Sequence, residues 1–133
     1  MQNIEKKTAL GLDDNVGALI CYAGNFICSF GLIYSIIVVV TDKTNKFARF
    51  HAFQSILCSL IGLIFGLSAV IGGAIAGIID GLLGFPLLTL VIALAAFVFG
   101  IIGLISIIRA AINAFKGEIY KITLIGALAD KWS

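Results

Sequence analysis

Long uncharged stretches alternate with short polar segments along the chain. Residues 1–15 are polar, and residues 16–40 carry no charged side chain. As a helix with ~1.5 Å of rise per residue, residues 16–40 would be about 37 Å long, which exceeds the ~30 Å of a hydrocarbon core. The pattern therefore predicts a first membrane span. We expect it to be retained, because a cleaved signal sequence has a shorter apolar stretch.

A second uncharged region is long enough for two more spans. Residues 52–108 contain one charged side chain, Asp80, within a short segment that also holds glycines and the single proline. One crossing needs about 20 residues, and glycine and proline are typical of turns. The pattern therefore predicts two helices, at residues 52–79 and 85–108, joined by a tight hairpin.

The end of the chain has a different periodicity. Over residues 109–128 apolar side chains recur at steps of three and four residues, which predicts an amphipathic segment at the membrane interface, followed by a tail at 129–133. The expected fold is all-α, an integral membrane bundle of three transmembrane helices with a short C-terminal amphipathic interfacial segment. Residues 16–128 would form one domain.

Composition agrees with a membrane protein. Hydrophobic residues make up 61% of the chain and charged residues 12%, whereas soluble domains carry about 25% charged residues. We therefore expect membrane lipids as partners. The net charge of +2 is too small for a nucleic-acid footprint, and no basic stripe is present, so we expect no nucleic acid partner.

The lysines and arginines predict an orientation. With three crossings, the first loop and the C-terminus share one side and hold seven of the nine Lys and Arg residues. The positive-inside rule then places both in the cytoplasm and the N-terminus outside. The expected location is the cell membrane, crossed several times.

Small side chains recur at alternating steps of three and four residues in each predicted span. This period keeps one narrow face toward a neighbouring helix, where small residues allow close approach. A pore between helices could use the same faces. We favour a closely packed bundle, because no ionisable side chain lies at mid-depth. The glycines expected to pack helices are Gly24, Gly31, Gly62, Gly66, Gly73, Gly100 and Gly103.

Candidate chemistry is sparse. One His and three Cys lack the spacing of a metal site, and no nucleophile and base form a pair, so we expect no catalytic residue, no metal and no cofactor. Cys21 and Cys28 lie about 10 Å apart along one helix, too far for a disulfide. With Cys58, they are expected to be small packing residues. Asn25, the most polar mid-span residue, is expected to form an interhelical hydrogen bond.

Polar and aromatic residues are densest just before the second predicted span. Two interpretations fit this segment: an anchor that fixes the depth of the helix in the interface, or a docking surface in which His51 and Gln54 pair with a neighbouring helix or the C-terminal segment. We favour the anchor. The candidate interaction residues here are Lys46, Phe47, Arg49, Phe50, His51 and Gln54.

Two motifs carry a family resemblance. Phe-x-Arg-Phe-His-Ala-x-Gln-Ser at residues 47–55, together with the segment 114–126, which contains Lys116 and Gly117, resembles small bacterial and archaeal membrane proteins similar to the Tic-twenty subunit of the chloroplast inner-envelope translocon. The resemblance covers about residues 18–128. It implies a helical bundle and, through distant kinship, a part in protein translocation.

Three classes of function remain. We favour a non-enzymatic membrane protein that packs against partners, as an accessory subunit or a homo-oligomer. The alternative is a component of a protein-translocation or solute-transport pathway. A membrane enzyme is the least favoured class, because His51 is the only conventional base and has no paired group.

Overall fold

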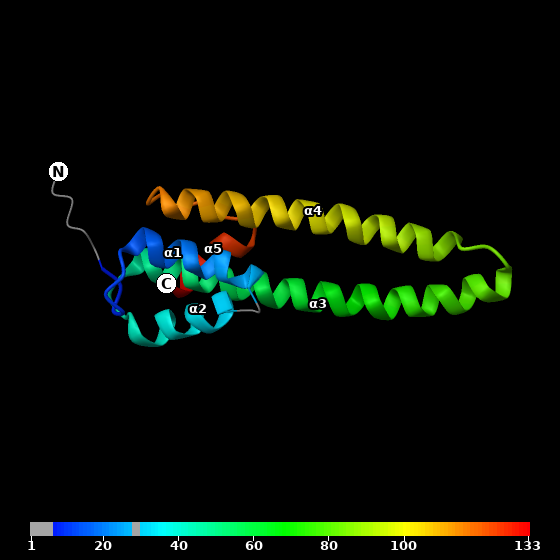
Figure 1. Cartoon of the computed structure of the whole chain (residues 1–133), viewed down its shortest axis with the longest axis horizontal. Helices are drawn as coiled ribbons and strands as arrows, with labels where there is room; N and C mark the ends of the chain where they lie inside the picture. Colours follow the sequence, from blue (N-terminus) through cyan, green and yellow to red (C-terminus); the bar gives the residue numbers. More distant parts are fainter. Residues whose placement is uncertain (1–6, 28–29) are drawn as a thin grey trace. The chain divides into compact units, whose positions relative to one another are not determined.

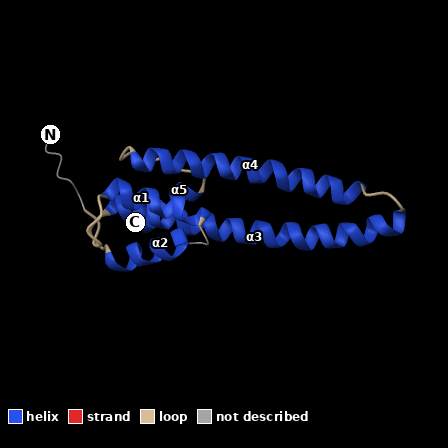
Figure 2. Cartoon of the chain, viewed as in Figure 1, coloured by secondary structure: helices blue, strands red, loops and turns tan. Residues whose placement is uncertain are grey.

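In the computed structural model, which describes residues 7–27 and 30–133, the chain is helical (Figure 2). No strand occurs within these ranges, apart from an isolated bridge between Lys7 and Asp13. The elements in chain order are α1 (Asp14–Ala23), the 3-10 helix η1 (Gly24–Phe26), α2 (Phe30–Thr41), α3 (Lys46–Leu83), α4 (Leu87–Phe115) and α5 (Ile125–Trp132) (Figure 1).

The helices contribute to two compact units. The five-helix unit contains α1, α2, α5, the part of α3 up to Ser59 and the part of α4 from Ser106. The hairpin unit is Leu60–Ile105, which comprises the remaining parts of α3 and α4.

The first span expected from the sequence is not one helix. Residues 16–40 fall into α1, η1 and α2, and α1 contacts α2 in the five-helix unit. The two helices approach closely at glycines, because a Cβ on Gly24 would lie 2.6 Å from the Gly31 nitrogen. A Cβ on Gly31 would lie 2.5 Å from the Cys21 carbonyl oxygen. The chain therefore turns back where the hydropathy predicted a straight crossing.

Small residues form the core of the five-helix unit. Buried alanines come from four helices, α1, α3, α4 and α5, which lets the helix axes approach. One cluster joins Ala18 and Tyr22 of α1 to the end of α4 and to Ile122. A second cluster joins Cys21 and Val38 to the start of α3. The buried alanines are Ala18, Ala48, Ala52, Ala110, Ala114 and Ala129.

The amphipathic segment expected over residues 109–128 is divided among the end of α4, a non-helical stretch and the start of α5. Helix α4 continues to Phe115 and stops at Gly117, whose φ of 77° favours glycine. Residues 118–122 are non-helical, and α5 begins at Ile125. Ile122 and Ala129 are buried, so this segment packs inside the five-helix unit.

The two helices predicted at 52–79 and 85–108 lie within α3 and α4, and the hairpin unit contains most of both. Its turn uses Gly84 at φ 78°, whose N–H donates to the Asp80 carbonyl oxygen at 2.8 Å. The Asp80 carboxylate accepts from the Leu88 and Thr89 N–H groups at 3.0 and 2.7 Å. These bonds satisfy free donors at the start of α4, where a negative charge is also favoured by the helix dipole.

The outer surface of the hairpin unit is apolar. Large side chains such as Val70, Ile78 and Phe97 are 66 to 70% exposed. Helices α3 and α4 are long and apolar enough to cross a membrane, and none of the most apolar window of either helix is buried. In the described part of the chain there are two such helices, in place of the three spans expected from the sequence.

Candidate functional site: a buried polar cluster in the five-helix unit

Three polar side chains from α1 and α3 meet inside the five-helix unit. The Tyr22 hydroxyl lies 3.0 Å from His51 Nδ1, and Gln54 Nε2 donates to the same hydroxyl at 2.9 Å. All three side chains have 0% exposure. A buried polar group without partners is costly, so these bonds fix how α1 lies against α3. We call Tyr22, His51 and Gln54 the polar cluster.

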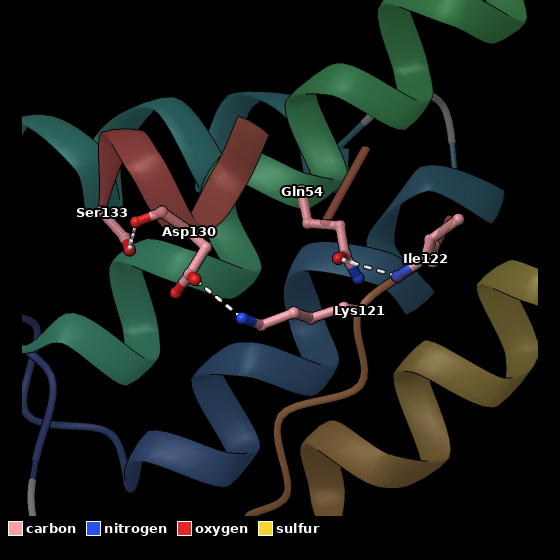
Figure 3. A network of polar contacts seen from close by, with 5 residues as sticks. All are labelled: Gln54, Lys121, Ile122, Asp130 and Ser133. Atoms are coloured by element: carbon pink, nitrogen blue, oxygen red, sulfur yellow. Dashed lines mark hydrogen bonds and ion pairs between the residues drawn. The ribbon is translucent and has the colours of Figure 1, made fainter. Parts of the chain in front are cut away.

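Gln54 also holds the C-terminal segment. Its Nε2 donates to the Tyr120 carbonyl oxygen at 3.0 Å, and its Oε1 accepts from the Ile122 N–H at 3.2 Å. Figure 3 shows the second of these bonds. One side-chain amide thus satisfies two backbone groups of a segment that forms no helix, as a neighbouring strand would.

A close approach accompanies this contact. A Cβ on Gly126 would lie 2.6 Å from Lys121 Cα and 3.0 Å from Gln54 Oε1. Next to this close approach, Lys121 Nζ forms an ion pair with Asp130 Oδ2 at 2.7 Å, which is also drawn in Figure 3. Both charged side chains are about half exposed, so the ion pair adds little stability. The glycine and the amide therefore hold the turn into α5 more firmly than the charges do.

A second group of polar contacts holds the end of α1 and η1 against α3. Asn25 Nδ2 donates to the Ser55 and Ser59 hydroxyl oxygens at 3.1 and 3.0 Å. The Ser55 hydroxyl donates to the Cys21 carbonyl oxygen at 2.6 Å. Asn25 therefore forms contacts between helices, which is the type of bond expected from the sequence.

Arg49 links the ends of two helices. Its Nη1 donates to the carbonyl oxygens of Val39 and Asp42 at 3.0 and 3.3 Å, and its Nε donates to that of Ser133 at 3.1 Å. These carbonyls lie at the C-terminal ends of α2 and α5, where the helix dipole favours a cation. Its guanidinium also lies 5.5 Å from the centre of the Phe53 ring. Arg49 thus fastens α2 and α5 to α3.

The surroundings of His51 are aromatic. The rings of Tyr22, Phe47 and Phe50 contact it edge-on, with centroid separations of 5.7, 4.6 and 5.2 Å. His51 Nε2 is buried and has no hydrogen-bond partner among the described residues. Within the same ranges no three His, Cys, Asp or Glu side chains gather in a way that could hold a metal ion. The contacts of His51 therefore serve to orient α1 against α3.

Of the remaining interaction candidates from the sequence, Phe47 and Phe50 pack against His51 of the polar cluster, and the others lie outside it. Lys46 is exposed at the start of α3, and Lys116 and Gly117 are exposed after α4. Phe50 is buried in the five-helix unit and Phe47 is half-buried. Among the predicted interaction residues, Asn25 bonds to α3, and His51 and Gln54 bond to α1. Cys28 lies outside the described residues.

The glycines expected to pack helices divide into two groups. Gly24 and Gly31 face each other between α1 and α2. A Cβ added to any of the other five would meet nothing within 4 Å, so these glycines do not bring α3 and α4 together within the chain. These five are Gly62, Gly66, Gly73, Gly100 and Gly103.

Three participants were not among the sequence candidates: Tyr22, and the backbone of Tyr120 and Ile122. A tyrosine within an apolar stretch is a usable signal, because a buried phenol needs a partner for its hydroxyl. The two backbone groups have no comparable signal, since every residue other than proline offers the same N–H and C=O.

The two long apolar helices, and a compact unit whose polar groups turn inward, define a small helical membrane protein. The chain belongs to the magnetosome magnetite crystal formation protein family, MamF/MmsF, which matches residues 13–129. It is 33% identical over 132 residues to the UPF0132 membrane protein MJ1443 of Methanocaldococcus jannaschii, a match that covers 96% of this chain and 94% of that protein.

A second relative from the same archaeon is the UPF0132 membrane protein MJ1527. It is 32% identical over 124 residues, which cover 93% of this chain and 73% of the relative. No solved structure matches the chain.

The resemblance to the Tic-twenty family is wrong. The family match covers both motifs on which that resemblance rested, and both relatives are UPF0132 membrane proteins. The structure gives a physical reason for the error. Gln54 of the first motif bonds to the backbone of Tyr120 and Ile122 within the second motif, so the two motifs describe how a C-terminal segment packs on a helix. Such a packing pattern does not specify a translocon.

Proposed function

We propose that this protein is a non-enzymatic membrane subunit that acts by packing its two spans against other membrane helices, from a second copy or from a partner protein. The observation that carries the proposal is the open glycine faces of α3 and α4. Gly62, Gly66 and Gly73 follow one another at steps of four and seven residues on α3, and a Cβ added to any of them would meet nothing within 4 Å among the described residues.

Glycine is costly in a helix that faces only lipid. Each glycine is about 1 kcal/mol less favourable than alanine in a helix interior. A face of small residues offsets this cost when the backbone of a neighbouring helix packs closely against it, because packing and not hydrophobicity drives helix association in lipid. The open faces therefore favour a binding role for the spans.

The burial and mutual hydrogen bonding of the polar side chains support a non-enzymatic role. His51, Gln54 and Tyr22 bond to one another and to the C-terminal segment, and each is fully buried. A general base must reach the proton that it abstracts, and groups shielded in this way serve structure better than catalysis. Protein translocation, which rested on the Tic-twenty resemblance, is withdrawn.

The family description suggests the process in which the subunit acts. Because the family is described for magnetite crystal formation in magnetosomes, we place the chain in a membrane assembly that supports crystal formation. The loop at residues 42–45, the start of α3 and the C-terminal segment face the cytoplasm in this proposal, since Lys43, Lys46 and Lys131 lie there. Expression in a magnetite-forming bacterium that lacks its own family member should restore crystal size; unchanged crystals would contradict this process.

Crosslinking in native membranes tests the packing role. The wild type should give a crosslinked species larger than one chain, and Gly66→Leu should reduce its yield by about tenfold, equivalent to ~1.4 kcal/mol of association free energy. Leucine is a better helix former than glycine, so the loss would not reflect a weakened helix. The matched control is Leu67→Ile, at an exposed position one residue away. Recovery of the wild type only as a monomer would contradict the proposal.

A further inference from the structure

We infer that α1, η1 and α2 form a re-entrant hairpin that enters and leaves one leaflet, with the acyl chains of that leaflet covering its outer face. The chain then crosses the membrane twice. The residues before α1 lie on the same side as the loop at residues 42–45, which reverses the orientation that three spans would give to the N-terminus. The inference does not depend on the proposed function.

Both ends of the hairpin are tied to one short loop. The Asn45 side-chain amide donates to the Asp14 carboxylate at the start of α1. The Ala9 N–H donates to Asp42 Oδ2 at 3.2 Å, directly after α2. A single span would place these two ends on opposite sides of a hydrocarbon core ~30 Å thick. Hydrogen bonds between the two ends of the hairpin require that both ends lie on the same side of the membrane.

Neither arm of the hairpin is long enough to cross. The described residues from α1 through η1, Asp14–Phe26, give about 20 Å at ~1.5 Å per residue, and the 12 residues of α2 give about 18 Å. A core of ~30 Å needs about 20 residues. Each arm fits a little more than one leaflet.

The outer face of α2 is more apolar than its inner face. Phe30, Ile33 and Val40 point outward with exposures of 61, 56 and 63%, whereas Gly31 and Ser35 face the unit and are buried. A helix on the surface of a water-soluble protein has the reverse arrangement. The outer side chains are exposed to the same degree as the apolar surface of the hairpin unit, which indicates the same surroundings, lipid.

At the tip of the hairpin, several polar groups of the described residues are bonded within the protein, whereas Asn25 Oδ1 is buried without a partner. Asn25 turns its amide toward the Ser55 and Ser59 hydroxyls of α3. The Ile27 N–H donates to the Gly24 carbonyl oxygen at 3.1 Å, and the Phe30 N–H donates to that of Ile27 at 3.0 Å. Non-helical backbone is tolerated at membrane depth when its polar groups are bonded within the protein. Phe26 and Ile27, 58 and 65% exposed, provide an apolar tip.

The charges give independent support. With two crossings, all nine Lys and Arg residues of the sequence lie on one side, and the turn at residues 81–86 on the other side has none. With three crossings, Lys6 and Lys7 would lie opposite the remaining seven. The positive-inside rule therefore favours two crossings.

Labelling with a membrane-impermeant maleimide tests the crossing number in the full chain. Single cysteines are introduced as Asn3→Cys, Thr44→Cys and Leu82→Cys in a background in which the three native cysteines are alanine. We expect Asn3→Cys and Thr44→Cys to react from the same side, and Leu82→Cys to react from the other side. Reaction of Asn3→Cys from the side of Leu82→Cys would overturn the inference. If the cysteine-free background fails to fold, epitope tags before Met1 and after Thr44 in the wild type give the same comparison.

Spin labels test the occupant of the outer face. The protein is placed in vesicles of phosphatidylethanolamine and phosphatidylglycerol. A label at Ile33→Cys should collide with oxygen as often as a label at Val70→Cys does. A water-soluble nickel chelate should collide with a label at Thr44→Cys but not with the label at Ile33→Cys. A water-like label at Ile33→Cys would overturn the inference. A label at Ile33→Cys that is shielded from both oxygen and the nickel chelate would show a protein neighbour in place of lipid and would also overturn it.

Discussion

At the scale of single residues, Gln54 connects three segments of the five-helix unit that lie far apart in the sequence. It bonds to Tyr22 from α1 and to the backbone at Tyr120 and Ile122, across 66 and 68 positions of the sequence. Its Nε2 and Oε1 atoms bond to three groups, and the Gln54 and Tyr22 side chains are fully buried. A residue placed in this way determines whether the C-terminal segment docks.

Replacing Gln54 should therefore destabilise the protein. Gln54→Leu keeps the volume of the side chain but leaves the Ile122 N–H and the Tyr120 carbonyl without partners, at ~1–3 kcal/mol for a buried unsatisfied group. We expect a lower unfolding temperature in detergent, measured by circular dichroism. Lys116→Leu, at an exposed position, is the control and should leave the temperature unchanged. Equal stability of the two variants would contradict the role given to Gln54.

Arg49 is the second residue with contacts to several segments. Because its guanidinium donates to Ser133 and Trp132 carbonyls, Arg49→Met should loosen α5 while α4 stays intact. Amide hydrogen exchange in α5 should become faster by about an order of magnitude, as expected for loss of charge-assisted bonds worth ~1.5–3 kcal/mol. Arg49→Lys keeps the charge without the planar geometry and should give an intermediate rate. Unchanged exchange in α5 would show that other contacts hold it.

At the scale of elements, the contact between α1 and α2 depends on two glycines with no space for a side chain. Gly31→Ala would place a Cβ 2.5 Å from the Cys21 carbonyl oxygen, which belongs to backbone and cannot rotate away. The helices must separate, and overpacking of this kind costs ~1–3 kcal/mol.

Gly66→Ala is the matched comparison. Nothing lies within 4 Å of its added Cβ, and alanine is the better helix former by about 1 kcal/mol. In monomeric detergent-solubilised protein, we expect Gly31→Ala to lower the unfolding temperature and Gly66→Ala to raise it or leave it unchanged. Destabilisation of equal size by both substitutions would contradict the geometry described for α1 and α2.

The elements also show how far hydropathy could predict the fold. Helices α3 and α4 follow from it because a bilayer demands long runs of apolar residues, and Asp80 with Gly84 marks their turn. The break in residues 16–40 could not be predicted in the same way. Gly24, Asn25 and Gly31 are residues that a membrane span also tolerates, and the contact that brings Asp14 to Asn45 joins positions 31 residues apart.

The site was partly predictable for a related reason. His51 and Gln54 are conspicuous because polar side chains at the entrance to an apolar helix need partners. Which partners they find depends on how the chain folds back, and those of Gln54 include backbone groups that no residue type identifies. Gly62, Gly100 and Gly24 belong to the same sequence pattern of small residues. Only the structure shows that Gly24 packs against another segment of the chain, whereas nothing among the described residues lies beside Gly62 and Gly100.

At the scale of the whole molecule, polar contacts are concentrated inside the five-helix unit, and apolar side chains cover the outer surface of the hairpin unit. The hairpin unit offers neighbours two helices with open glycine faces. The central claim is that these faces are occupied by another helix in the membrane.

The most direct test is the mass of the protein released from native lipid nanodiscs, without crosslinker. We predict complexes heavier than the 14.0 kDa of one chain, either multiples of that mass or one chain with a partner, and their loss in Gly66→Leu. A single 14.0 kDa species from the wild type, unchanged in Gly66→Leu, would contradict the account.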